Sequence, residues 1–312
     1  MKIILTGATG FIGQHVLPLL HGHEVCIISR KEKPSDWKFG GSWIKGSVSE
    51  KEKIQKAFTG ADVLINLAAE IKDENLFHQT NIIGTNNLLE LCKENGVKRV
   101  IHLSSVGVVG MQYSAKDIVV DENTSCNPKN GYEKTKYESE KRIEAIANEN
   151  VHVVILRPTN VFGDNHPRQA LLGFLKNIQQ KKQMACTKAA KVNYVYVGDL
   201  ANTIAYFVAN KEAAPGIYNV GYSLDFSYFY ELACKLMDRE PRLRILGRTL
   251  LGFLSAVGFF GISKIKRAAQ AVSNQVMYSD EKLQQLQKHR FGVEKGLMHT
   301  IEWYKKKGVL DA

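Results

Sequence analysis

Three glycines at regular spacing follow directly on an apolar run at the start of the chain. The run is Ile3-Ile4-Leu5. The glycines are Gly7, Gly10 and Gly13, in the segment of residues 6–13 with the sequence Thr-Gly-Ala-Thr-Gly-Phe-Ile-Gly. Without side chains, such a turn lets the backbone approach a pyrophosphate, and the free amides that open the following helix face its negative charge. The pattern predicts a strand, a dinucleotide-binding turn and a helix, and therefore a parallel sheet.

Apolar runs alternate with helical patterns through the first half of the chain. The runs at residues 25–29, 63–67, 100–103 and 153–156 are typical of strands buried on both faces of a sheet. Helical spacing covers residues 75–95 and 134–148. This rhythm predicts an α/β fold of the Rossmann type, with a doubly wound parallel sheet.

The rhythm changes beyond Gly163. A helix at 169–180, a strand at 192–197, a helix from Asp199 and a strand at 216–220 precede a mostly helical tail. We expect residues 1–165 and 190–221 to form the dinucleotide-binding domain. Residues 166–189 and 222–312 should form a smaller, mostly helical C-terminal substrate lobe, with a cleft where this lobe meets the carboxyl edge of the sheet.

Charge and cysteine usage argue against several other classes of protein. The net charge of +11 is spread along the chain, and its densest clusters, at 264–267 and 305–307, contain too few aromatic residues for a nucleic-acid surface. The five cysteines lie far apart, so neither a metal site nor a disulfide framework is expected. A reducing, cytoplasmic setting is the prediction.

Two further segments bear on membranes. The apolar start of the chain meets the glycine turn too soon for the core of a secretory signal. The uncharged run at 249–263 falls short of the roughly 20 residues that a bilayer crossing needs. We expect no transmembrane segment and interpret this run as a buried or cleft-lining helix, with interfacial membrane contact as the alternative.

Tyr132 and Lys136 are four residues apart, which places a phenol and an ammonium on one face of a helix. A phenol with a pKa of about 10 is a poor base at neutral pH unless a nearby positive charge stabilises the phenolate. Ser104 and Ser105 follow the strand at 100–103, where the carboxyl edge of the sheet would present a hydroxyl to the same cleft. Arg30 follows the strand at 25–29, and its guanidinium suits a 2'-phosphate, so NADP is favoured over NAD.

With these features in family order, the chain resembles the NAD-dependent epimerase/dehydratase family of extended short-chain dehydrogenases/reductases. The resemblance runs over residues 1–221 and more loosely to the C-terminus. It rests on the segments 6–13, 62–69, 81–86, 104–110, 132–136, 157–163 and 195–200.

The resemblance implies a role for each matching residue. Ser105 would hydrogen-bond the reacting oxygen, Tyr132 would be the acid/base, and Lys136 would lower the pKa of Tyr132 and hold the nicotinamide ribose. Asn160 and Arg168 would bind the substrate, and basic groups such as Arg168 and Arg242 are candidates to hold its diphosphate. The expected cofactor-binding residues are Gly7, Thr9, Gly10, Phe11, Ile12, Arg30, Val48, Leu67, Ala68, Ala69, Asn81, Tyr132, Lys136, Pro158 and Val161.

Departures from the family pattern narrow the reaction. Ser47 stands where the family usually has an aspartate for the adenine, and Asp164 replaces a common proline. After Ser105 comes Val106-Gly107, whereas the similar sugar-nucleotide 4,6-dehydratases have an Asp-Glu pair, so elimination of water is not expected.

The leading hypothesis is therefore a nucleotide-sugar 4-epimerase or 4-ketoreductase, which the resemblance suggests is a homodimer. The first alternative is an NADPH-dependent reductase or dehydrogenase of an apolar alcohol or ketone, similar to the dihydroflavonol reductase and 3-beta-hydroxysteroid dehydrogenase branches. The second alternative is a non-catalytic regulator that senses dinucleotides.

Overall fold

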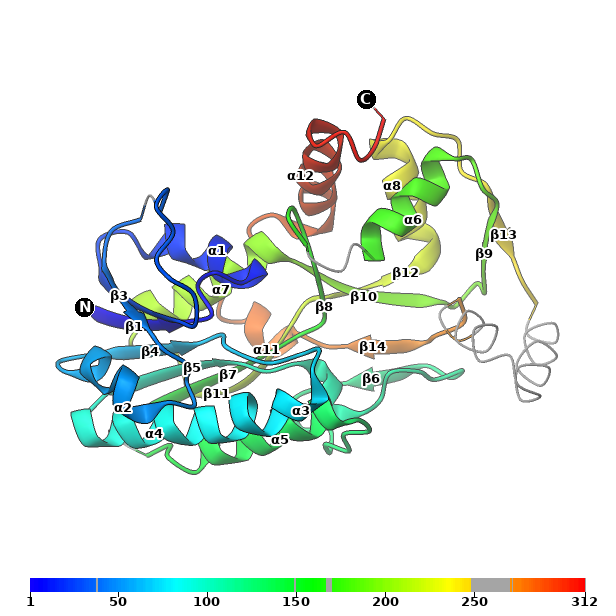
Figure 1. The fold of residues 1–312 in the computed structure, drawn as a ribbon. Helices are drawn as coiled ribbons and strands as arrows, with labels where there is room; N and C mark the ends of the chain where they lie inside the picture. The colour runs from blue at the N-terminus through cyan, green and yellow to red at the C-terminus, as the bar shows by residue number, and fades with distance from the viewer. Residues whose placement is uncertain (38, 149, 167–169, 248–269, 271, 312) are drawn as a thin grey trace.

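A seven-stranded parallel sheet forms the centre of the larger lobe (Figure 1). The computed structural model describes the chain except residues 38, 149, 167–169, 248–269, 271 and 312. The strand order is β11-β7-β5-β4-β1-β2-β3, so the chain runs outward from β1 in both directions, as a doubly wound sheet does. The strands are β1 Lys2–Thr6, β2 Glu24–Ser29, β3 Ser42–Lys45, β4 Val63–Asn66, β5 Arg99–Leu103, β7 His152–Pro158 and β11 Gly216–Val220.

The apolar runs at 25–29, 63–67, 100–103 and 153–156 are confirmed as β2, β4, β5 and β7. The short strand expected at 216–220 is β11, at one edge of the sheet. β3 was not predicted, because it is a half-exposed edge strand of sequence Ser-Trp-Ile-Lys without a continuous apolar run.

Helices cover both faces of this sheet (Figure 1). On one face α1 (Phe11–Val16), its 3-10 extension Leu17–Leu20 and α7 (Val197–Ala209) pack in a core that contains Ile3 and Leu5. On the other face α2 (Lys51–Ile54), the 3-10 turn Gln55–Phe58, α4 (Gly84–Asn95) and α5 (Gly131–Glu144) pack in a core that contains Ile4. The alternation along β1 follows from the period of two in a strand, and it explains why buried parallel strands are apolar throughout.

Two of the predicted helices have different limits from those expected. The helix at 75–95 consists of α3 (Glu74–Phe77), a π-helical turn (His78–Ile83) and α4. The helix expected at 134–148 is α5, which begins earlier at Gly131, because the side chain of Asn130 accepts a hydrogen bond from the Glu133 amide and caps the helix. Tyr132 therefore lies in the first turn of α5.

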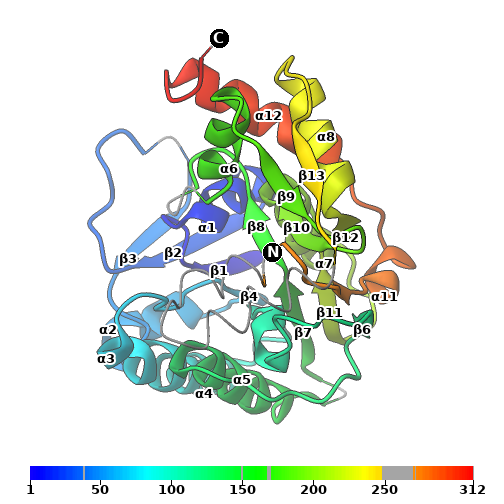
Figure 2. The ribbon, with the colours of Figure 1, turned by 90° about the vertical axis from the view of Figure 1, so that its right-hand side faces the viewer.

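The C-terminal lobe has a separate core between α6 (Ala170–Gln179), α8 (Phe226–Leu236) and α12 (Gly292–Lys306) (Figure 2). The strand predicted at 192–197 is β10 (Lys191–Tyr196), but it lies between β8 (Asn160–Phe162) and β12 (Tyr222–Asp225) in a three-stranded sheet of its own. The tail also holds more strand than the sequence predicted. The remaining elements are β6 Ile118–Val120, β9 Met184–Cys186, β13 Leu243–Ile245, β14 Val276–Tyr278, α11 Glu281–Gln284 and the 3-10 turn Val106–Val109.

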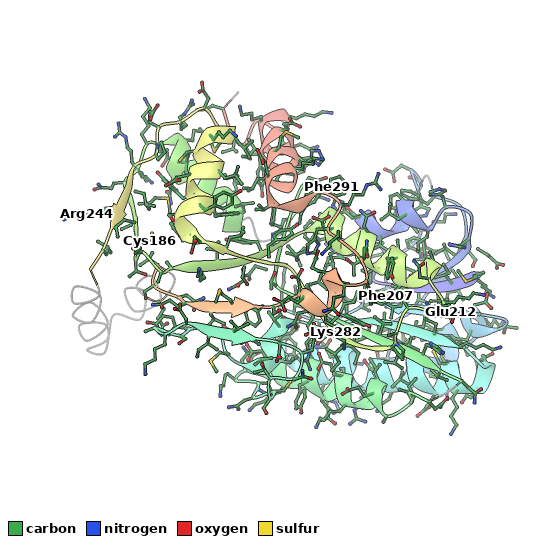
Figure 3. The ribbon with its side chains drawn as sticks, turned by 180° about the vertical axis from the view of Figure 1, so that it is seen from behind. Cys186, Phe207, Glu212, Arg244, Lys282 and Phe291 are labelled. Atoms are coloured by element: carbon green, nitrogen blue, oxygen red, sulfur yellow. The ribbon has the colours of Figure 1, made fainter. Side chains whose placement is uncertain are left out.

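One buried carboxylate joins the two lobes. Asp199, near the start of α7, accepts hydrogen bonds from the amides of Phe291 and Gly292 at 2.8 and 3.0 Å, and from the hydroxyl of Tyr222 on β12. Figure 3 shows Phe291 where the chain enters α12, next to α7. Since a carboxylate at the start of a helix satisfies its free amides, Asp199 fixes the direction in which α12 leaves the larger lobe.

The third glycine of the N-terminal turn yields a test of this packing. A β carbon at Gly13 would lie 2.2 Å from the Gly7 carbonyl oxygen, so Gly13→Ala forces two backbone segments apart. We expect a loss of about 3 kcal/mol in the free energy of unfolding, measured by urea denaturation.

Gly173 provides the matched control, because it lies within α6 and a β carbon there would meet nothing within 4 Å. Gly173→Ala should raise the free energy of unfolding by about 0.5–1 kcal/mol. Equal effects of the two substitutions would contradict the packing described for the turn.

Candidate active site

A cleft of about 1400 Å³ opens where the carboxyl ends of β1, β4, β5 and β7 meet the C-terminal lobe. This is the edge at which doubly wound sheets bind ligands. The lining residues are Gly7, Thr9, Gly10, Phe11, Ile12, Gly13, Gln14, Arg30, Lys31, Leu67, Ala69, Glu70, Ile71, Lys72, Leu103, Ser104, Ser105, Asn130, Tyr132, Lys136, Pro158, Thr159, Asn160, Val161, Phe162, Gly163, Asn165, His166, Leu171, Tyr194, Trp303 and Tyr304.

The glycine turn forms the floor of the cleft at the end of β1. Gly7 has a φ of +70°, and a β carbon there would lie 2.8 Å from the carbonyl carbon of Leu67. A β carbon at Gly10 would lie 3.1 Å from the Gly7 carbonyl oxygen. Only glycines therefore allow the turn to fold this tightly against the end of β4, and the turn lines the cleft, which fits a site for a pyrophosphate.

Ser105, Tyr132 and Lys136, predicted as a catalytic trio, all line this cleft. Ser105 follows β5, and its hydroxyl accepts a hydrogen bond from the Gly107 amide at 3.1 Å. Tyr132 lies in the first turn of α5 with its ring edge-on to Phe77, and the ring centroids are 6.1 Å apart. The structure thus brings a hydroxyl, a phenol and a lysine to one wall.

Lys136 is almost completely buried, with 2% of its surface exposed. Its Nζ donates to the Leu103 carbonyl oxygen at 2.6 Å and lies 3.2 Å from Nε2 of His102. Burial lowers the pKa of Lys136 to about 8, and the negative charge of Glu140 opposes this effect. Lys136 is therefore an amine poised near neutral pH within reach of the cleft.

Glu133 joins the helix that carries Tyr132 to the loop that follows Ser105. Its buried carboxylate accepts hydrogen bonds from the Lys129 amide at 2.7 Å and from the side chain of Gln112. Gly107 packs so closely on Glu133 that an added β carbon would lie 3.3 Å from its side chain. Sequence analysis missed this role, although Asn130 followed three residues later by a glutamate is a signal for a capped helix start.

Most of the predicted cofactor and substrate residues line the cleft, and several do not. Of the latter, Val48 packs in the core against Gly84, and Ala68 donates its amide to the Thr6 hydroxyl at 3.1 Å. Arg242 lies just before β13, and Figure 3 shows the nearby Arg244 at the far tip of the C-terminal lobe. Arg168 lies outside the described residues. Asn160 lines the cleft while its side chain donates to the Asn193 carbonyl oxygen at 3.0 Å.

Asn81 lies behind the cleft wall rather than in it. Its side-chain oxygen accepts from the Glu70 amide at 2.8 Å, and its nitrogen donates to the Glu70 carbonyl oxygen and to Thr135 at 3.1 and 3.0 Å. The π-helical turn places this side chain between the loop after β4 and α5. Asn81 therefore holds the Tyr132 helix against the end of β4.

The opposite side of the cleft is aromatic and was not predicted. Tyr194 on β10, Trp303 and Tyr304 on α12, and Leu171 on α6 face the cavity from the C-terminal lobe. The ring of Tyr194 stacks on Phe229 at 4.8 Å, which fixes its orientation. These residues are far apart in sequence, and only the folding of α12 over β10 places them opposite Tyr132.

The side-chain oxygens of Ser104 and Thr159 are buried and have no hydrogen-bond partner within the described part of the chain. Both residues line the cleft, but protein covers these two oxygens, and the Thr159 oxygen faces Gly221, where an added β carbon would lie 2.2 Å from it. The glycine turn is therefore the feature of the cleft that fits a dinucleotide.

Arg30, the residue behind the prediction of NADP, has a carboxylate beside it. Its guanidinium is 64% exposed and lies 3.9 Å from the Glu70 carboxylate, which lines the same cleft. Burial raises the pKa of Glu70, but three backbone amides and Arg30 outweigh this effect, so that its pKa is lowered overall. The ionised Glu70 partly neutralises the charge that would attract a 2'-phosphate.

Comparison with known proteins agrees with this geometry. The family model described as "NAD dependent epimerase/dehydratase family" matches residues 3–221. The N-acetyl-alpha-D-glucosaminyl-diphospho-ditrans,octacis-undecaprenol 4-epimerase of Escherichia coli O157:H7 is 29% identical over 290 residues, which cover 88% of this chain and 83% of that protein. The 2-alkyl-3-oxoalkanoate reductase of Stenotrophomonas maltophilia is 26% identical, over 69% of this chain and 67% of its own.

The fold is shared with a solved structure of UDP-glucose 4-epimerase with UDP-glucose from Thermotoga maritima. The TM-score is 0.74 at 21% sequence identity, over 98% of this chain and 99% of that one. Within the described ranges of the chain, no helix combines the length and the apolar character needed to pass through a membrane.

The burial of Lys136 predicts an effect on stability. Holding its charge in the fold at pH 7, with a pKa of about 8 against an unfolded value near 10.5, costs about 3 kcal/mol. Lys136→Met should therefore raise the free energy of unfolding at pH 7 by about 1–3 kcal/mol, measured by urea denaturation, even though it removes the bond to Leu103.

The stability gained by Lys136→Met should depend on pH. Between about pH 8 and pH 10.5 the unfolded chain holds the lysine proton and the folded chain has lost it, so native stability rises with pH. The advantage of the methionine variant should shrink over that range. An advantage that stays constant from pH 7 to pH 10 would contradict the lowered pKa.

Proposed function

Because this chain belongs to the NAD-dependent epimerase/dehydratase family, and is thus an enzyme of the extended short-chain dehydrogenase/reductase type, we propose that it is a nucleotide-sugar 4-epimerase or 4-ketoreductase. The observation that carries the proposal is the gathering of Ser105, Tyr132 and Lys136 on one wall of a cleft floored by the glycine turn. The wider substrate class is a sugar joined to a diphosphate, since the compound in the name of the Escherichia coli relative is a sugar joined through a diphosphate to undecaprenol.

The proposed chemistry needs only these three side chains and a hydride acceptor. Gly7 to Ile12, Leu67 and Pro158 would hold NAD, which would accept the hydride from C4 and give it back in the reverse step. Tyr132 acts as the base and takes the proton of the sugar hydroxyl at C4, while Lys136 in its ammonium form stabilises the phenolate. Ser105 donates a hydrogen bond to the reacting oxygen as it becomes a carbonyl. Return of the proton from Tyr132 reverses the step.

The two candidate outcomes differ in what happens to the ketone. If it turns in the cleft and is reduced on its other face, the net reaction is epimerisation at C4. If it leaves, or arrives as a substrate, the net reaction is oxidation or reduction. Neither outcome requires an acid or base besides Tyr132, whereas elimination of water would need a further pair, and Val106 and Gly107 cannot supply it.

The aromatic side of the cleft supports a ring-bearing substrate. Tyr194 and Trp303 offer flat surfaces opposite Tyr132, suited to the apolar face of a sugar or to a nucleobase. Asn160, which lines the same cleft, adds a hydrogen-bonding group for a sugar hydroxyl or a phosphate.

For the cofactor we propose NAD. The family is NAD dependent, and a preference for NADP rests on Arg30, whose charge Glu70 partly offsets.

Binding titrations of the two dinucleotides test the choice of cofactor. We expect NAD to bind at least tenfold more tightly than NADP, and Glu70→Gln to narrow this difference because it frees the charge of Arg30. Arg30→Ala is the matched control and should widen the difference. If the unaltered protein binds NADP more tightly than NAD, the proposal of NAD is wrong and NADP is the cofactor, as was predicted from the sequence.

A reductase of apolar ketones is the second candidate. The similarity to 2-alkyl-3-oxoalkanoate reductase favours it, as do Phe162, Leu171 and Trp303 in the cleft. The apolar run at 249–263, interpreted from the sequence as a buried or cleft-lining helix with interfacial membrane contact as the alternative, lies outside the described residues. The third hypothesis, a non-catalytic regulator, is not retained, because the family consists of enzymes.

Turnover of defined substrates by the purified protein tests the proposal. UDP-glucose, UDP-N-acetylglucosamine and undecaprenyl-diphospho-N-acetylglucosamine are each incubated with NAD, and epimers or ketosugars are detected by NMR or mass spectrometry. We expect Tyr132→Phe to lower kcat by at least about 10³-fold while the affinity for NAD changes little, because only the proton-transferring hydroxyl is removed.

Glu138→Gln, an exposed change on the same helix that breaks contacts with Lys141 and Arg142, is the control and should leave kcat unchanged. Turnover of 2-alkyl-3-oxoalkanoates with no turnover of any diphosphate sugar would favour the second candidate. Unaltered kcat in Tyr132→Phe would remove the proposed mechanism.

A further inference from the structure

A chain of buried polar side chains crosses the sheet and ends at Lys136. Thr6, Asn66 and His102 occupy paired positions on the neighbouring strands β1, β4 and β5, so their side chains point to the same face as α5. The Thr6 hydroxyl lies 2.8 Å from Asn66 Oδ1, Asn66 Nδ2 lies 3.2 Å from His102 Nδ1, and His102 Nε2 lies 3.2 Å from Lys136 Nζ. All four side chains are at most 3% exposed.

The direction of the hydrogen bonds in this chain is set at its far end. The Thr6 hydroxyl oxygen accepts the amides of Leu67 and Ala68, each at 3.1 Å, which occupies both of its lone pairs. Its proton must therefore go to Asn66 Oδ1. The amide nitrogen of Asn66 then faces His102, and Nδ1 of the imidazole must accept.

This direction determines where the imidazole keeps its proton. With Nδ1 as acceptor, a neutral His102 carries its proton on Nε2 and presents an N–H to Lys136. An ammonium has three donors and no lone pair, so only the amine form of Lys136 can accept that bond. The opposite arrangement would bring three donors to the Thr6 oxygen and leave its own proton without an acceptor.

We infer that His102 is a positioning residue for Lys136, held by Thr6 and Asn66 as the Nε2–H tautomer, and that it sets the pH above which the lysine ceases to support Tyr132. The inference rests on the proposed function only for the role of Lys136 in turnover. It adds Thr6, Asn66 and His102 to the residues that influence the reaction. Thr6 links this row to the loop after β4 through the amides of Leu67 and Ala68.

The charges around the chain are consistent with this assignment. Burial, and then the positive charge of Lys136, lower the pKa of His102 well below its usual value, so the ring is neutral at physiological pH. Glu140, on the same helix as Lys136, is a further charged group that acts on the lysine. Glu140 favours the ammonium, but its carboxylate is already bound to Arg157 at 2.7 and 3.0 Å.

The tautomer can be observed directly. Protein labelled with [15N]histidine is studied by long-range 1H–15N correlation NMR without substrate, and the signals of His102 among the nine histidines are those missing from His102→Phe or His102→Gln. We expect a neutral ring with its proton on Nε2 from about pH 6 to about pH 9. A proton on Nδ1, or a charged ring at pH 6, would overturn the inference whether or not the protein acts on sugars.

Asn66→Asp is the variant that should reverse the chain. A carboxylate only accepts, so it would take the Thr6 proton and also the proton of His102 Nδ1, leaving Nε2 free to accept from the Lys136 ammonium. We expect the NMR signals to report the Nδ1–H tautomer. The alkaline limit of the pH–kcat profile should rise by about one pH unit.

The carboxylate also attracts the lysine charge directly, so the same substitution is made in a His102→Phe background. In that background the carboxylate at position 66 is present and the imidazole is absent. We expect Asn66→Asp to move the alkaline limit of the pH–kcat profile less than half as far there as it does in the protein that retains His102. An equal shift in both backgrounds would show a direct charge effect and refute the positioning role. Thr6→Ser keeps the hydroxyl and should retain the Nε2–H tautomer, while loss of this tautomer there would likewise count against the inference.

Discussion

The burial of one lysine between a helix and a parallel sheet is the constraint on which the active-site wall depends. Lys136 reaches the cleft because α5 packs against this face of the sheet, and at the carboxyl end of β5 its Nζ donates to the Leu103 carbonyl oxygen and lies 3.2 Å from Nε2 of His102. Burial destabilises the ammonium form of Lys136 and lowers its pKa. The protonation of the lysine is therefore sensitive to the charge of any ligand that enters the cleft. The cap at Asn130, the carboxylate of Glu133 and the amide of Asn81 all hold α5 in the place that this contact requires.

Much of the larger lobe was predictable from the sequence, because it is built from local signals. The glycine spacing fixed the first turn, continuous apolar runs marked the central strands, and the four-residue interval between Tyr132 and Lys136 placed both on one side of a helix. Side chains that interact across strands were not predictable. Thr6, Asn66 and His102 become neighbours only once the strand register is known, and a single sequence does not reveal it.

The aromatic side of the cleft escaped prediction for a related reason. Tyr194 lies between buried residues on β10, a strand whose sheet the sequence did not predict, and Trp303 lies in a tail that was predicted only as mostly helical. The position of Trp303 depends on Asp199 of α7, because its carboxylate binds the amides of Phe291 and Gly292 and so fixes the start of α12. Residues that contribute to a site through the placement of a whole helix leave little trace in local patterns.

The C-terminal lobe has its own hydrophobic core, distinct from the two cores on either side of the large sheet. Of the glycine turn, Phe11 and Ile12 pack against this core, so mutations that repack the lobe away from these two residues leave both the lysine and the turn in place. Such a division allows evolution to exchange one substrate for another while the chemistry is inherited unchanged. A chain of this kind should accept new specificities by drift in α6, α8 and α12, and homologues that share its reaction steps should differ most in that region.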